Sequence, residues 1–334
     1  MADVLAQIIP FLYIGTIIYL ANQQAATGRA VALVRLLISS LAILPVFYAV
    51  TAVVSIFFPP SDSPLPQISP AVALLTVVIA VMLGLASVLV IRGPALRVSL
   101  KRFFGAGYDP NSIVHLTALV MILALISVTI SNFALSGGIS GLAEEIQTDE
   151  SAIPSLILTQ TIWMLSALLG VGLLIRRTPK QAAARLGLRF PRPEDFNWGL
   201  GYGLLCYIGV IGFVAIWVLL TSPELFAEQT AASQQLAGVF SSVPQVFVLS
   251  LLIGIGEEIF FRGAIQPVFG IGFTSVFFAL LHTQYTLTPA TLALFGVSLV
   301  LGWLRQRHST SAAIIAHFIY NFVQLALGIL VTST

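Results

Sequence analysis

The chain carries very little charge. Lysine, arginine, aspartate and glutamate together make up 8% of its 334 residues, whereas a soluble domain carries about a quarter. Apolar residues reach 58%, which excludes an ordinary water-soluble domain and predicts a protein of the lipid bilayer. The formal net charge is only +2, and no basic run could follow a phosphate backbone, so nucleic acid is excluded as a partner.

Cysteine is almost absent as well. The single Cys206 excludes an intramolecular disulfide and every metal site built from several cysteines. A metal would have to bind histidine and carboxylate side chains. The first residues, Met1 to Asp3, lack the basic segment of a secretory signal and the arginine-rich character of a transit peptide. We therefore expect the first apolar stretch to remain as a membrane span.

Long apolar runs fill most of the sequence. A spanning helix needs about 20 mostly apolar residues, and in lipid only helices and closed barrels satisfy their backbone hydrogen bonds. The alternating pattern of barrel strands is missing, so the predicted fold class is all-α, a polytopic transmembrane helical bundle of about ten spans. The predicted spans are 4–22, 32–58, 70–91, 112–134, 153–175, 198–221, 242–262, 271–287, 289–305 and 311–331.

Loop charges alternate along this series of spans. Lysine and arginine gather in every second loop, and six of them lie between positions 176 and 192. Because basic residues concentrate in cytoplasmic loops, the pattern predicts that both termini face outward. The intervening loops contain no lysine or arginine and carry the acidic residues Asp62, Glu144, Glu145, Asp149, Glu150, Glu224 and Glu228.

A few polar residues lie inside the predicted spans. Each central ionisable group costs roughly 2.5–3.5 kcal/mol to insert into a membrane, so such residues need a structural or functional reason. They are Glu257, Glu258 and Arg262 on span 242–262, His282 on span 271–287, and His317 with Asn321 on span 311–331.

Helical spacing sorts these residues into groups. Glu258 and Arg262 are four residues apart, which favours an ion pair that could be purely structural. Glu257 is turned about 100° away and has no partner on its own helix. Such a carboxylate would hold or exchange a proton near neutral pH, as a general base does. His317 and Asn321 are also four residues apart, so their side chains point the same way.

Glycines flank the acidic pair. Gly254, Gly256 and Gly263 permit either a close approach of neighbouring helices or a local break in the helix. Depth estimates from the span ends place the polar groups of all three spans in the cytoplasmic half of the membrane. The sequence therefore predicts that these groups meet in one site.

Three motifs in order resemble a known family. Glu257-Glu258-Ile-Phe-Phe-Arg262 is followed by Phe278-x-x-x-His282 and then by His317-x-x-x-Asn321. This series is similar to the EExxxR, FxxxH and HxxxN motifs of the CPBP intramembrane proteases, the CAAX-protease, bacteriocin-processing and Abi-like group. The resemblance extends over about residues 150–331. It implies an N-terminal membrane region of about four spans over 1–150, without an assigned function, and a protease core of about six spans over 151–334.

The resemblance also implies roles for the motif residues. Glu257 would activate water, and His282 would share that task. The pair Glu258 and Arg262 would orient the Glu257 carboxylate. His317 and Asn321 would stabilise the oxyanion. The residue types suit this chemistry, because hydrolysis of an amide by water needs a base, an acid and donors to the developing oxyanion. The implied activity is an intramembrane endopeptidase of the prokaryotic plasma membrane. Its partners would be the lipid bilayer and a membrane-associated or lipid-anchored peptide or protein substrate.

Two other functions and one cofactor remain open. Carboxylates and histidines inside spans also build proton- or ion-coupled transporters, and a catalytically inactive scaffold could keep the same fold. His282, His317 and Glu257 would make a zinc site of two histidines and a carboxylate. The HExxH motif is absent, so we favour a site without an obligatory metal or other cofactor and keep zinc as a possibility.

Overall fold

The described part of the chain is helical throughout. The computed structural model describes residues 2–57, 69–136, 152–223, 226–227, 230, 234, 238–240, 242–282 and 290–332. Within these ranges every regular element is a helix, which confirms the predicted helical membrane bundle. The helices are α1 (Ala2–Thr27), α2 (Val31–Leu41), α3 (Ile43–Phe57), α4 (Pro70–Arg92), α5 (Pro94–Phe104), α6 (Ile113–Leu135), α8 (Ala152–Gly170), α9 (Pro179–Leu186), α10 (Pro193–Leu220), α12 (Val243–Glu258), the π-helix η1 (Ile259–Ile265), α13 (Gln266–Leu281), α14 (Ala290–Arg307) and α15 (Thr310–Thr332).

Seven helical segments are long and apolar enough to cross a bilayer. They comprise α4, α6, α8, α10, most of α15, a segment made of α2 with most of α3, and the 39-residue segment Val243–Leu281. The helices α1 and α14 are outside this group. Every predicted span contains a helix, but the span predicted over 153–175 ends earlier, because α8 stops at Gly170 and residues 171–175 form turns. Residues 283–289, between α13 and α14, lie outside the described residues. The number of ten spans therefore stays a prediction.

The segment from Val243 to Leu281 folds back on itself. Its 39 residues would extend about 58 Å as one straight helix, twice the thickness of the hydrocarbon core. Gly270 interrupts the helix with φ 80° and ψ 165°, a conformation that glycine adopts without strain. Glu257 and His282 would be about 38 Å apart along a straight helix, yet their side chains approach to 3.8 Å. The chain therefore reverses direction between α12 and the end of α13, and the division into two spans stays a prediction.

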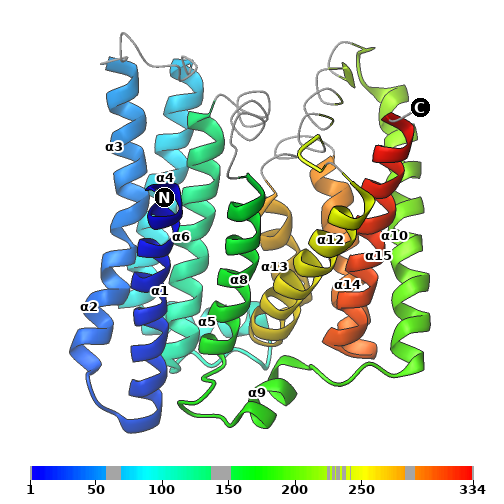
Figure 1. Cartoon of the computed structure of the whole chain (residues 1–334). Coiled ribbons are helices and arrows are strands. Elements are labelled where there is room, and N and C mark those ends of the chain that lie inside the picture. Colours follow the sequence, from blue (N-terminus) through cyan, green and yellow to red (C-terminus); the bar gives the residue numbers. More distant parts are fainter. Residues whose placement is uncertain are drawn as a thin grey trace.

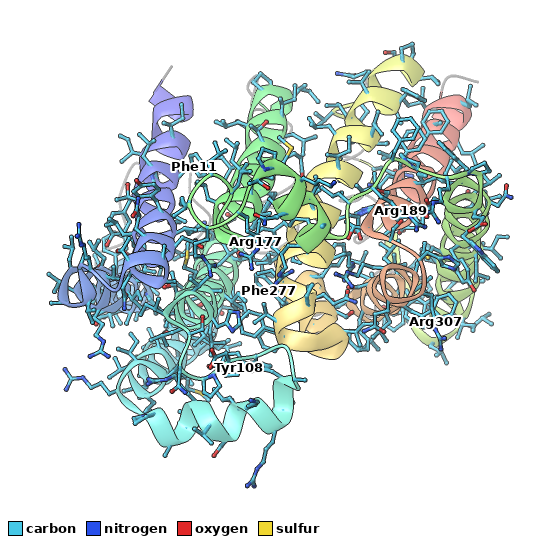
Figure 2. All side chains as sticks on the ribbon, turned by 90° about the horizontal axis from the view of Figure 1, so that it is seen from below. Phe11, Tyr108, Arg177, Arg189, Phe277 and Arg307 are labelled. Atoms are coloured by element: carbon cyan, nitrogen blue, oxygen red, sulfur yellow. The ribbon has the colours of Figure 1, made fainter. Side chains whose placement is uncertain are left out.

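Basic residues gather at one end of the bundle. The turn between α1 and α2, the helix α5 and the helix α9 all lie at the lower end in Figure 1. Figure 2 views this end from below, with Arg177, Arg189 and Arg307 distributed across it. The alternation of loop charge thus corresponds to one basic face. The acidic loop residues Asp62, Glu144, Glu145, Asp149, Glu150, Glu224 and Glu228 lie outside the described residues.

The N-terminal helices share a hydrophobic core with the later part of the chain. Helix α8 packs against α1 on one side and against α12 and η1 on the other. On the basic side, the rings of Phe104 and Phe269 meet at 5.0 Å between centroids. Gly107 fits here because a Cβ at this position would lie 1.9 Å from the carbonyl oxygen of Pro267. The proposed division near residue 150 stays a prediction, and residues 137–151 lie outside the described residues.

Candidate active site

The acidic pair lies where an α-helix becomes a π-helix. Helix α12 ends at Glu258 and continues directly into η1, whereas the sequence predicted a span over 242–262 and left a local break of its helix open. Short π-helical segments are rare and occur frequently at functional sites. Two arginines bind this segment from outside: Arg305 Nε donates to the Arg262 carbonyl at 3.1 Å, and Arg185 Nη1 donates to the Gly263 carbonyl at 3.0 Å. The backbone after the acidic pair is therefore anchored to α14 and α9.

Arg185 lies in a crowded basic environment. Burial lowers the pKa of its guanidinium to about 10, and repulsion from nearby arginines, including Arg177 and Arg305, acts in the same direction. Even so, the group stays protonated at neutral pH. Its hydrogen bond to the Gly263 carbonyl offsets part of the cost of burying this charge beside η1.

Two glycines allow the neighbouring helices to approach the acidic pair. A Cβ on Gly256 would lie 2.8 Å from the main-chain oxygen of Gln160 on α8. A Cβ on Gly254 would lie 3.2 Å from the main-chain oxygen of Ile314 on α15. The contact at Gly256 is too close for a side chain, and the contact at Gly254 is tighter than an ordinary van der Waals contact. The glycines therefore serve helix packing, one of the two predicted alternatives, and they bring Gln160 and His317 up to the carboxylates.

Glu258 is the centre of a fully buried charge cluster. One carboxylate oxygen, Oε2, accepts from Arg262 Nε at 3.0 Å, and the other, Oε1, contacts His317 Nδ1 at 2.9 Å. The side chains of Glu258 and Arg262 are 0% exposed. The predicted ion pair is thus present. His317, 59 positions after Glu258 in the sequence, also contacts the carboxylate. Both oxygens of this carboxylate are used, which leaves no free oxygen to receive a proton from water.

Arg262 is held on several sides. Its Nη2 donates to Ser298 Oγ on α14 at 3.0 Å, and the guanidinium lies 5.2 Å from the centre of the Phe278 ring. A cation over an aromatic face is attracted by the ring quadrupole. Its Nη1 is buried and has no hydrogen-bond partner among the described residues. The contacts to α13 and α14 make this arginine the connection between three elements of the site.

Glu257 has a different environment from Glu258. Its Oε1 accepts from Gln160 Nε2 at 3.3 Å, and its Oε2 lies 3.8 Å from His282 Nε2. That second distance is too long for a direct hydrogen bond. The Oε2 atom is buried and makes no hydrogen bond to a described residue. Glu257 therefore has one oxygen fixed by α8 and one oxygen available, next to an imidazole.

His282 ends α13 and is fixed by Phe278. The imidazole stacks on the Phe278 ring at 4.3 Å between centroids, and its Nδ1 is 2.7 Å from the Phe278 carbonyl oxygen. A carbonyl oxygen can only accept, so Nδ1 carries the hydrogen in this contact. In neutral His282 the lone pair is then on Nε2, which is the atom that faces Glu257. The FxxxH spacing is what places ring and carbonyl under the imidazole.

The structure brings together five of the six predicted residues. Asn321 lies one turn beyond His317 on α15 and is partly buried, but its carboxamide makes no hydrogen bond to any residue that the structure describes. Two participants were not predicted, Gln160 and Ser298. Gln160 has a recognisable signal, because a carboxamide within a transmembrane run is costly and needs a partner. Ser298 has none, since small hydroxyl residues are common in membrane helices.

A separate cluster of hydrogen bonds holds the beginning of α15. Asp195 is fully buried at the start of α10, where it accepts from Arg189 Nη2 at 2.8 Å and from Ser309 Oγ at 2.9 Å. Its other oxygen accepts from the Arg192 backbone at 2.8 Å. Because Ser309 directly precedes α15, this contact fixes the helix that carries His317.

The donors do not converge as a three-ligand metal site. No group of three or more His, Cys, Asp or Glu side chains within the described ranges is arranged to hold a metal ion. The two imidazoles face different carboxylates, since His317 contacts Glu258 while His282 faces Glu257. The side chains His282, His317 and Glu257, which the sequence left open as zinc ligands, are therefore not gathered around a common point in this geometry. The absence of an obligatory cofactor stays a prediction.

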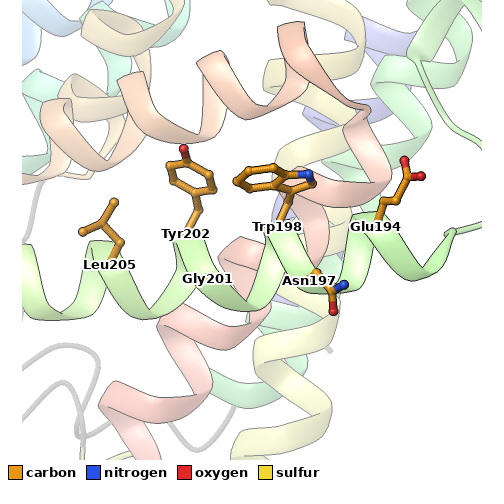
Figure 3. Close-up of a pocket in the computed structure, with 6 residues that line it drawn as sticks. All are labelled: Glu194, Asn197, Trp198, Gly201, Tyr202 and Leu205. Carbon is orange, nitrogen blue, oxygen red and sulfur yellow. The ribbon is translucent and has the colours of Figure 1, made fainter.

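A shallow groove along α10, lined by aromatic side chains that point toward α14 (Figure 3), is separate from this site. It has a volume of about 500 Å³, and Trp198, Tyr202 and Leu205 line it (Figure 3). The Tyr202 ring lies 5.2 Å from that of Trp303 on α14. Aromatic residues of this kind are typical of the zone where a membrane protein meets the lipid headgroups. The groove shares no residue with the buried charge cluster.

Fold and site together define a class, a helical membrane protein with a buried cluster of carboxylates, imidazoles and one guanidinium. Residues 239–323 match the family model for the Rce1-like type II CAAX prenyl endopeptidases. All six predicted site residues lie inside this range. The match agrees with the resemblance to CPBP intramembrane proteases and supports a CAAX-type intramembrane peptidase. Comparisons with curated proteins and with solved structures gave no match.

Proposed function

We propose that the chain is an intramembrane endopeptidase in which Glu257 and His282 activate a water molecule. The observation that carries this proposal is the pair of facing atoms, Glu257 Oε2 and His282 Nε2, separated by 3.8 Å. The carboxylate oxygen is buried and lacks a described partner. A water molecule that bridges two such groups is nearly as favourable as a direct hydrogen bond. The match at residues 239–323 supports the same chemistry.

In the proposed reaction the water oxygen attacks the carbonyl carbon of the scissile amide. The Glu257 carboxylate accepts one proton from the water, and the neutral His282 Nε2 orients the water from the other side. The proton then passes to the leaving nitrogen as the C–N bond breaks. The second hydrogen of the water stays on the new carboxyl group, so the products are a carboxylic acid and an amine, and the glutamate returns to its ionised form.

His317 is proposed to stabilise the developing oxyanion. Its Nδ1 contacts the buried carboxylate of Glu258 at 2.9 Å, and the other ring nitrogen, Nε2, is proposed to donate to the oxyanion. Asn321, one turn further along α15, is proposed as the second donor. Arg262 balances the charge of Glu258 and keeps that carboxylate from competing as a base.

The substrate is proposed to be a lipid-anchored peptide with a prenylated cysteine. The experiment uses the purified protein in liposomes and a quenched-fluorescent peptide that ends in S-farnesyl cysteine and three further residues. The E257Q variant should lose about 100-fold or more of kcat, the usual effect of removing a general base. The matched control is E194Q, the same change at an exposed glutamate, and it should keep the wild-type rate.

Each outcome of this experiment has a separate meaning. Cleavage that disappears in E257Q and persists in a strong zinc chelator supports the glutamate-activated mechanism. Cleavage that a chelator abolishes and zinc restores would refute it in favour of the metal-dependent alternative. Absence of E257Q-sensitive cleavage would refute the peptidase assignment and favour a transporter, which proton-driven uptake in vesicles would then test, or a scaffold.

A further inference from the structure

Gln160 is a buried carboxamide in a transmembrane helix, and the three family motifs do not include it. It lies on α8 and is 4% exposed. Burying an amide without hydrogen bonds is costly. Its Nε2 donates to Glu257 Oε1 at 3.3 Å, while its own Oε1 is buried and has no hydrogen-bond partner among the described residues. The contact to Glu257 is therefore the one hydrogen bond that this carboxamide makes to a described residue.

The position of Gln160 is tightly determined. A Cβ on Gly256 would lie 2.6 Å from Gln160 Oε1, so the glycine next to Glu257 makes the space that the carboxamide occupies. One turn further along α8, the ring of Trp163 packs on Phe260 of η1 at 4.4 Å between centroids. Helix α8 therefore contacts the chain both before the acidic pair, at Gly256, and after it, at Phe260. These two contacts fix the position of Gln160.

This contact divides the two oxygens of Glu257 between different tasks. The terminal torsion of a glutamate is broad and roughly two-fold, so a free carboxylate can turn either oxygen toward a neighbour. Gln160 occupies Oε1, and Oε2 then faces His282 Nε2.

The geometry points to Gln160 as a positioning residue for the reaction, which holds Glu257 with Oε2 presented to the water beside His282. This inference rests on the proposed function. Gln160 acts through Glu257 and does not contact the reacting atoms. Its loss should therefore reduce the rate of the chemical step and leave substrate binding unchanged.

The test compares Q160M with the neighbouring control T161V. Methionine keeps a long unbranched side chain and removes the donor. Thr161 is turned about 100° from Gln160, and its hydroxyl donates within its own helix to the Ile157 carbonyl. With the farnesylated peptide, Q160M should lose about 10- to 100-fold of kcat with KM within about twofold. T161V should match the wild type, and Q160L provides a second variant of the same design.

A spectroscopic measurement keeps this test independent of turnover. The carboxylate stretching band of Glu257 is assigned from the infrared difference between the wild type and E257Q. Loss of the hydrogen bond should shift this band in Q160M and Q160L but not in T161V. An active wild type with unchanged kcat in Q160M would overturn the inference, as would an unshifted band. Absence of cleavage by the wild type would refute the proposed function, while the band would still decide whether Gln160 holds Glu257.

Discussion

Replacing Arg262 with methionine tests the buried charge cluster most directly. The guanidinium and the Glu258 carboxylate are both 0% exposed and 3.0 Å apart. R262M leaves Glu258 as a buried charge with only His317 to balance it. Removing one partner of a buried pair costs about 3–5 kcal/mol, far more than the loss of a surface ion pair. We expect the free energy of unfolding to fall by this amount.

The double variant E258Q/R262M separates burial of charge from loss of contacts. It removes both charges, and a glutamine at 258 can still accept a hydrogen bond from His317. Replacing a buried ion pair as a whole is often nearly neutral. We therefore expect the double variant to be more stable than R262M by about 2 kcal/mol or more. R29M, at an exposed arginine between α1 and α2, serves as the control and should change stability by less than about 0.5 kcal/mol.

The assay is equilibrium unfolding in mixed micelles with increasing sodium dodecyl sulfate, followed by tryptophan fluorescence. The chain contains four tryptophans, which provide the signal. An R262M variant within about 1 kcal/mol of the wild type would contradict the reasoning from a dry, paired site. The losses of stability in E258Q and R262M should not simply add in the double variant, because the effects of coupled residues are not additive. A double variant whose loss equals the sum of the two single losses would contradict the reasoning as well.

Two further predictions concern packing around the site. G256A should lose about 1–3 kcal/mol of stability and most of its peptidase activity, because the added methyl group overlaps Gln160. The control is G209A, where a Cβ meets nothing within 4 Å. This variant should match the wild type in the same unfolding and cleavage assays. D195N should lower the unfolding midpoint and cost about 2–3 kcal/mol, because an amide cannot accept from all three donors that Asp195 binds. E194Q, at the exposed neighbour, should unfold like the wild type, and an equally stable D195N would show that the Asp195 contacts do not hold α15.

The helices and the ion pair followed from local features of the sequence. Apolar runs of about 20 residues are sufficient to predict membrane helices, and the spacing of Glu258 and Arg262 is enough to place both on one face of a helix. The stacking of Phe278 under His282 also follows from a spacing of four. These predictions depend on one helix at a time, which is why they could be made without knowledge of the packing.

The tertiary partners did not follow from the sequence. Gln160 reaches Glu257 across 97 positions, and His317 reaches Glu258 across 59. These contacts depend on which helices are neighbours, and helical spacing carries no information about that. The π-helix after Glu258 likewise has no marker in the sequence, and two of its carbonyls accept from Arg185 and Arg305, which are distant along the chain. The spacing of His317 and Asn321 predicted that both side chains point the same way, but it could not show that the His317 imidazole contacts the Glu258 carboxylate. The catalytic roles of all six residues stay predictions.

The two arginines that bind η1 also connect the site to the basic face of the bundle. Arg185 belongs to the short helix α9, outside the candidate membrane spans, and its side chain ends on a carbonyl of the residue after Arg262. A ligand that displaced α9 would pull on the backbone that carries the buried ion pair. An inhibitor of this kind would act from the aqueous phase. Such a ligand would bind at the basic face, outside the hydrocarbon core and away from the buried carboxylates.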